Sequence, residues 1–97
     1  MDPLDGTTNF VHNYPFYGVS IALFHDNEVI VGVVIELPSM NIYKATSSSA
    51  SYCNDDLINV SGTNKLLNSL LVTGFGYVHE ENWQKNMKLF KLFTDVT

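Results

Sequence analysis

Basic residues are scarce in this chain. Its 97 residues include five lysines or arginines against ten aspartates or glutamates, which gives a formal net charge of −5 and a pI near 4.8. A protein that binds nucleic acid needs a surplus of Lys and Arg to neutralise the phosphates. The composition therefore excludes nucleic acid as an expected partner.

Long hydrophobic runs are also absent. The longest nearly apolar stretch, residues 29–37, contains Glu36 and is stopped by Pro38, whereas a membrane-spanning helix needs about 20 apolar residues. The N-terminus is acidic and polar, unlike a secretory signal or a transit peptide. We therefore expect no membrane partner and an intracellular, cytoplasmic location. Import into an organelle stays open, because a targeting signal would lie upstream.

Cysteine and histidine offer little chemistry. Cys53 is the single cysteine, so a disulfide within the chain is excluded and a reducing compartment is expected. No basic residue lies close to it in the sequence, so we expect an unreactive strand residue rather than a nucleophile. His12, His25 and His79 do not have the spacing of a metal-binding triad, and we expect each to form local hydrogen bonds in a loop or turn.

Alternating and β-branched patterns predict a meandering sheet. Residues 16–24 alternate large and small side chains with the period of two that is typical of a strand. Residues 29–37 are nearly continuously β-branched or apolar, which predicts a second, central strand that is covered on both faces. Turn-forming residues separate further predicted strands, at 42–46, 51–54, 57–61 and 70–76.

The hydrophobic period changes near the C-terminus. Trp83, Met87, Phe90 and Phe93 recur every three or four residues. This spacing predicts an amphipathic helix from 82 to about 94, with its aromatic side chains in the core. We therefore expect an α+β fold, a mostly antiparallel meandering sheet with a C-terminal amphipathic helix.

Residues suited to metal binding are concentrated at positions 2–10, which read DPLDGTTNF. In a tight turn the carboxylates of Asp2 and Asp5 would converge. The Leu4 carbonyl would add a third oxygen, and oxygen is the ligand atom that Mg²⁺ prefers. The stretch therefore predicts a site for a hard divalent cation.

The same stretch also has features of a phosphate site. Gly6 lets the backbone approach a ligand closely, so the N–H groups of Gly6 and Thr7 could face an anion. The Thr7 hydroxyl could orient a water molecule. Together with a cation, this arrangement predicts metal-assisted phosphoester hydrolysis. The alternative is an ordinary turn, since Pro, Asp and Gly favour turns in this order.

The motif resembles a known phosphatase family. Residues 2–12, DPLDGTTNFVH, and 15–23, PFYGVSIAL, closely resemble the inositol monophosphatase family. Weaker similarity continues to the end of the chain, through 32–34, 50–54, 73–75, Trp83, Asn86 and Met87. The resemblance implies Mg²⁺-dependent, lithium-sensitive hydrolysis of myo-inositol monophosphate on a layered αβαβα fold, with the complete protein a homodimer.

The resemblance also implies roles for individual residues. Asp2, the Leu4 carbonyl and Asp5 would be metal ligands, and Gly6 and Thr7 would contact the phosphate. The Thr7 hydroxyl would help to hold the nucleophilic water. Asp5 would also lie near the inositol ring, so Asp5 and Thr7 would be the catalytic residues.

The resemblance further implies that the site is incomplete. The family's metal-binding glutamate precedes this segment and its last metal-binding aspartate follows it, so we interpret residues 1–97 as a single partial domain, the central segment of the family domain. A catalytically incomplete fragment is therefore one alternative to a working phosphatase, and a phosphatase for histidinol phosphate or nucleotide bisphosphate is another. Glu80 and Glu81 are conceivable substitute ligands, but an acidic pair where a helix begins is typical of a solvated surface.

Overall fold

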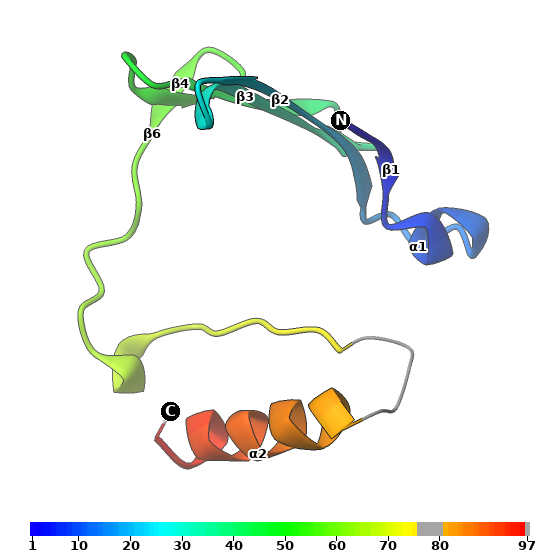
Figure 1. The fold of residues 1–97 in the computed structure, drawn as a ribbon, viewed down its shortest axis with the longest axis vertical. Coiled ribbons are helices and arrows are strands. Elements are labelled where there is room, and N and C mark those ends of the chain that lie inside the picture. The colour runs from blue at the N-terminus through cyan, green and yellow to red at the C-terminus, as the bar shows by residue number, and fades with distance from the viewer. Residues whose placement is uncertain (76–80, 97) are drawn as a thin grey trace. The chain divides into compact units, whose positions relative to one another are not determined.

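The computed structural model describes residues 1–75 and 81–96. It divides into two compact units, Met1–Val60 and Ser61–Thr97. The first unit contains a sheet and the second contains a long helix (Figure 1). The expectation that the whole chain forms part of one domain stays a prediction.

The first unit is an antiparallel meander. Its six strands occur in the sheet in the same order as in the sequence, and each neighbouring pair is antiparallel. The strands are β1 (Asp2–Asp5), β2 (Tyr17–His25), β3 (Glu28–Leu37), β4 (Asn41–Thr46), β5 (Ser51–Cys53) and β6 (Asp56–Ile58), with the helix α1 (Thr7–Val11) between β1 and β2. The predicted fold class is thereby confirmed, although the strand predicted at 57–61 is shorter than expected.

Tight turns explain why the strands pair with their sequence neighbours. Asp26 and Asn27 form the two-residue connection between β2 and β3, and both have positive φ, 49° and 63°. Two consecutive positive φ values match the right-handed twist of paired strands. Asn54, with φ 55°, is the positive-φ residue of the connection between β5 and β6. Its side chain accepts a hydrogen bond from the Ile42 backbone N–H at 3.0 Å, which also ties this turn to β4.

The two faces of the sheet differ in side-chain size. On one face β2 presents Val19, Ile21 and Leu23, and on the other it presents Gly18 and Ser20. The strand β3 is central, as predicted, because it lies between β2 and β4. The expected cover is not found, since no side chain in the described ranges is buried and Leu23 is 55% exposed. Within Met1–Val60, the apolar face of the sheet therefore has no second layer above it.

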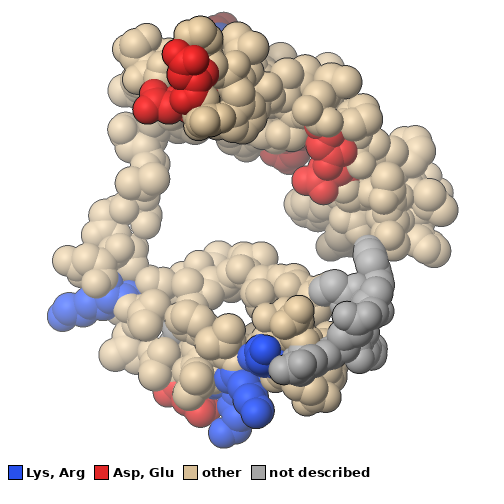
Figure 2. All heavy atoms as spheres, in the orientation of Figure 1, with Lys and Arg blue, Asp and Glu red and all other residues tan. Residues whose placement is uncertain are grey.

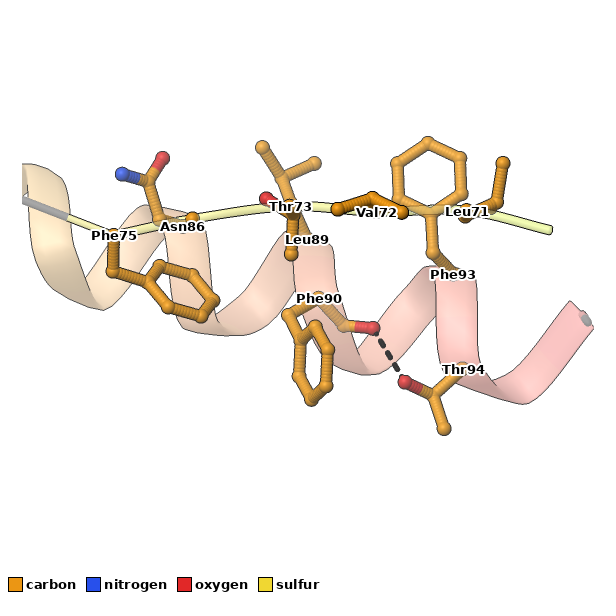
Figure 3. A pocket seen from close by; sticks show the side chains of 10 residues that line it. Leu71, Val72, Thr73, Phe75, Asn86, Leu89, Phe90, Phe93 and Thr94 are labelled. Carbon is orange, nitrogen blue, oxygen red and sulfur yellow. Dashed lines mark hydrogen bonds between the residues drawn. The ribbon is translucent and has the colours of Figure 1, made fainter. Parts of the chain in front are cut away.

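The second unit is built around α2 (Glu81–Val96). The predicted helix is confirmed and extends about a turn farther in total than the spacing indicated. A short 3₁₀ turn, η1 (Leu66–Asn68), precedes an extended segment that runs beside the helix (Figure 3). The Phe75 and Phe90 rings meet edge to face with centroids 5.9 Å apart. The expectation of a buried aromatic core is wrong, because Phe90 and Phe93 are 46% and 48% exposed.

The strand predicted at 70–76 is also wrong over its described part. Residues 70–75 are extended but belong to no strand, and Gly76 lies outside the described residues. A strand needs a neighbour for its backbone hydrogen bonds. Residues 71–75 instead lie against α2, and together with it they line a hollow of about 450 Å³. Within residues 1–75 and 81–96, no helix has the length and apolar content needed to cross a bilayer.

Candidate functional site

A left-handed glycine joins the two halves of the motif. Asp2–Asp5 forms β1, and Gly6 follows with φ 81° and ψ 38° as the N-cap of α1. A side chain at this position would be strained at such a φ. Its Cβ would also lie 2.9 Å from the Phe16 carbonyl oxygen and 3.2 Å from Tyr17 Cα. Glycine is therefore required for the chain to turn from the strand into the helix.

A register shift in β1 places both motif carboxylates on one face. Asp2 lies opposite Ser20 and Asp5 lies opposite Gly18. Three steps along β1 thus match two steps along β2, which is the extra residue of a β-bulge. Opposed residues of an antiparallel pair share a face, and Ser20 and Gly18 share a face because strands alternate with a period of two. Without the shift, residues three apart would point to opposite faces.

The expected tight turn at Asp2–Asp5 is therefore corrected to a bulged strand. Oδ1 of Asp2 accepts a hydrogen bond from the Leu4 N–H at 3.2 Å. Both carboxylates are exposed and Leu4 is half-buried. The predicted ligand oxygens of Asp2, Leu4 and Asp5 thus come from one short strand, and the two carboxylates belong to a common face.

The predicted phosphate contacts lie where α1 begins. The first N–H groups of a helix have no carbonyl partner within it, and Gly6 has no side chain that could cap them. Thr7, the first helical residue, is exposed. The sequence suggested only a turn here, so the five-residue helix is a correction. Its first turn is closed by the Phe10 N–H, which donates to the Gly6 carbonyl at 3.0 Å.

A hollow of about 420 Å³ adjoins Asp5 and Gly6. Glu36 lines it from β3, where it lies opposite Gly18 and hence on the face that carries Asp5. The Tyr43 hydroxyl donates to Glu36 Oε2 at 3.1 Å. This bond, with a smaller effect of Cys53, raises the pKa of Tyr43 above its ordinary value of 10.0, because the carboxylate favours the protonated hydroxyl. The sequence gave no signal for this pair, which depends on strand register.

The other sequence candidates do not join this site. His25 Nε2 lies 3.2 Å from Asp26 Oδ2 at the exposed β2–β3 turn, as expected for a locally bonded histidine. His12 follows α1 as its C-cap. Cys53 is a half-buried free thiol in β5. His79 and Glu80 lie outside the described residues, as does the side chain of Glu81.

Charge is unevenly divided between the two units. Met1–Val60 holds seven of the ten carboxylates and one of the five lysines. Figure 2 shows red carboxylates on the sheet unit and blue lysines on the helical unit. Within residues 1–75 and 81–96, however, no three His, Cys, Asp or Glu side chains are grouped so that they could hold a metal ion. Among the described residues, the motif therefore offers two carboxylates on one face, those of Asp2 and Asp5.

Comparison with known proteins identifies the family. The model of the inositol monophosphatase family matches residues 1–97. The chain is 41% identical over 103 residues to the chloroplastic phosphatase IMPL1 of Arabidopsis thaliana, and 41% identical over 97 residues to inositol-1-monophosphatase of Synechocystis. Both alignments cover 100% of this chain, but they cover 28% and 34% of those relatives. This chain belongs to the inositol monophosphatase family.

A solved structure agrees with the fold. The structure of inositol monophosphatase from Anabaena (Nostoc) matches with a TM-score of 0.89 and 38% identity. The match covers 98% of this chain and 39% of that one. The fold is thus one found in inositol monophosphatases, and the chain spans about a third of the length of the relatives it matches.

Proposed function

We propose that this chain supplies the metal- and phosphate-binding part of a Mg²⁺-dependent phosphomonoesterase whose substrate is a myo-inositol monophosphate. The observation that carries the proposal is the common face of Asp2 and Asp5, produced by the shift in β1. The names of the relatives support phosphatase chemistry and inositol phosphate as the substrate. Assembly as a homodimer, which the family resemblance implies, stays a prediction.

The motif residues fit Mg²⁺ in the type of ligand that they offer. Asp2, Asp5 and the Leu4 carbonyl are all oxygen donors, and Mg²⁺ commonly binds to one or two carboxylates together with water and phosphate oxygens. Two carboxylates match the charge of one divalent cation. A bound cation would polarise the phosphate and lower the pKa of a bound water.

The neighbouring residues would then act on the substrate. The Gly6 and Thr7 N–H groups would bind phosphate oxygens at the start of α1, and the Thr7 hydroxyl would hold the attacking water. Asp5 would lie near a hydroxyl of the inositol ring. In this proposal Thr7 orients the attacking water and Asp5 orients the substrate.

A second proposal concerns the isolated 97-residue chain, which we expect to be catalytically incomplete. The observation that favours it is that the described residues contain no group of three or more His, Cys, Asp or Glu side chains that could hold a metal ion. Two cations held by two carboxylates would be poorly neutralised. A related substrate, histidinol phosphate or a nucleotide bisphosphate, stays an alternative to inositol phosphate.

A Mg²⁺ titration of the 97-residue chain tests the metal site. The Gly6 amide resonance is followed by NMR in the native chain, in Asp5→Asn and in Asp26→Asn as a matched control. Asp26 lies at the β2–β3 turn and its side chain is 89% exposed. Removing one negative charge about 4 Å from a divalent cation in water costs about 2 kcal/mol, or roughly 30-fold in affinity. We expect this loss for Asp5→Asn and an unchanged affinity for Asp26→Asn.

Phosphate release from myo-inositol monophosphate separates the two proposals. We expect no Mg²⁺-dependent release by the isolated chain. Turnover that requires both Mg²⁺ and Asp5 would refute catalytic incompleteness while supporting the metal site. Equal Mg²⁺ affinities of the native chain and Asp5→Asn would refute the metal site itself.

A further inference from the structure

The left-handed turn at Gly6 is held by a contact with the start of β2. A Cβ at Gly6 would lie 2.9 Å from the Phe16 carbonyl oxygen, so that carbonyl already packs against the Gly6 backbone. The position of Phe16 therefore constrains the conformation of Gly6, and with it the path from Asp5 into α1. An interaction that holds the Phe16 carbonyl in place therefore also holds the turn at Gly6 in place.

Asn9 makes that connection from inside α1. Its side-chain amide donates to the Phe16 carbonyl oxygen at 2.7 Å. The backbone carbonyl of Asn9 accepts a second hydrogen bond, from the Tyr14 N–H, at 2.8 Å. A single residue of α1 thus ties two points of the following loop back to the helix. Asn9 is half-buried, whereas Thr7 and Thr8 before it are exposed.

The chemistry of the contact requires an amide donor. The Phe16 carbonyl can only accept a hydrogen bond, and an ionised carboxylate offers acceptors alone. Asn9→Asp would therefore replace attraction by repulsion at nearly constant shape, whereas a protonated carboxyl group could donate again. Asn9 also lines the hollow beside Asp5 and Gly6, but it is not one of the motif's proposed metal or phosphate ligands.

We propose that Asn9 is a positioning residue, whose amide holds the Phe16 carbonyl against Gly6 and thereby sets the turn that presents Asp5 and Thr7. The catalytic meaning of this role rests on the proposed function. The positioning itself does not, because it concerns the conformation of Gly6 in the chain without ligand. Asn9 is not among the proposed metal and phosphate ligands, and it would act on them through the backbone carbonyl of Phe16.

The experiment measures the Gly6 amide resonance in the 97-residue chain without Mg²⁺, in Asn9→Asp, Asn9→Ala and the control Asn27→Asp. Asn27 lies in the β2–β3 turn and receives the same change of charge. Each variant is compared with the native chain at the same pH, which removes the effect of the neighbouring Asp2 and Asp5. We expect both Asn9 variants to shift Gly6 at neutral pH and Asn27→Asp to leave it in place.

The pH profile distinguishes a donor from mere packing. As the new carboxyl group of Asn9→Asp is protonated, its Gly6 resonance should return towards the native position, while that of Asn9→Ala should not. Protection of the β2–β3 amides from hydrogen exchange checks that each variant keeps the sheet. A Gly6 resonance unmoved by both Asn9 variants would overturn the proposal. An equal shift in both at every pH would also overturn it.

A Mg²⁺ titration at neutral pH then links the turn to the site. Groups that orient metal ligands typically change metal affinity by about tenfold or more when removed, and we expect about tenfold weaker binding in Asn9→Ala. If Asn9→Ala bound Mg²⁺ as tightly as the native chain while Asp5→Asn bound it more weakly, the positioning of Asp5 by Asn9 would be overturned. Unchanged affinity in Asp5→Asn would instead defeat the proposed function, and the pH profile of Gly6 would still decide the role of Asn9.

Discussion

Gly18 and Gly32 lie in the same pair of strands but have opposite surroundings. Gly18 lies opposite Glu36 and Gly32 lies opposite Ala22, all within the β2–β3 ladder. A Cβ at Gly18 would meet the Ile35 carbonyl oxygen at 2.6 Å, whereas a Cβ at Gly32 would have nothing within 4 Å. We therefore predict that Gly18→Ala destabilises the hairpin and that Gly32→Ala stabilises it.

The magnitudes follow from the local geometry. The contact at Gly18 would be about 0.8 Å shorter than an ordinary contact of 3.4 Å, and the backbone oxygen cannot rotate away. Overpacking of this kind costs about 1–3 kcal/mol, while replacing a glycine whose conformation suits alanine stabilises by about 0.4–1 kcal/mol. The net expectation is about 1–2 kcal/mol of destabilisation for Gly18→Ala and about 0.5 kcal/mol of stabilisation for Gly32→Ala.

Native-state hydrogen exchange of the β2 and β3 amides measures both effects, because it reports the free energy of local opening. A difference of about 2 kcal/mol between the variants corresponds to roughly 30-fold in the opening equilibrium. The two alanines serve as controls for each other, since they add the same methyl group to the same hairpin. Equal protection in both variants would refute the argument from the Ile35 carbonyl.

Two further predictions concern hydrogen bonds in the sheet unit. Because the Glu36 carboxylate raises the Tyr43 pKa, Glu36→Gln should lower that pKa towards 10.0, measured by tyrosinate absorbance with Tyr43→Phe to assign the signal. The bond's stabilising effect should be complete below about pH 10 and lost as pH rises through the folded-state pKa; an unchanged midpoint in Glu36→Gln would contradict this. Asn54→Ala should destabilise the β4–β5 hairpin by about 1–2 kcal/mol, because the bond from Ile42 N–H at 3.0 Å is lost at a positive φ. Asn54→Gly, which relieves only the backbone, should recover part of the loss in amide protection, and full recovery would exclude a role for the side chain.

Local patterns were enough to predict the hairpins and the long helix. The alternation in 16–24, the β-branched run in 29–37 and the turn residues between them are all short-range signals, and β2 and β3 pair as expected. The helical spacing in α2 is equally local. Residues 70–75 could not be assigned in this way, because an apolar extended segment becomes a strand only if a partner strand is available.

The residues of the proposed site come from the sequence, whereas their arrangement could be described only from the structure. The sequence indicated that Asp2 and Asp5 converge, but it indicated a tight turn where the structure has a strand with a register shift. That shift depends on pairing with β2, so the motif alone does not contain it. Asn9 was missed for a similar reason. The signal that could have found it is the tendency of Asn side chains to bond nearby backbone groups, here with a partner seven residues away.

The shift in β1 has a consequence for transplanting the motif into another protein. The nine letters DPLDGTTNF do not encode a common face for the two carboxylates by themselves, since that face comes from a neighbouring strand that advances two residues while β1 advances three. A designer who grafts the motif onto a regular strand would obtain Asp2 and Asp5 on opposite sides of the new sheet. The portable unit is therefore the bulged pair of β1 and β2, together with the loop that Asn9 closes.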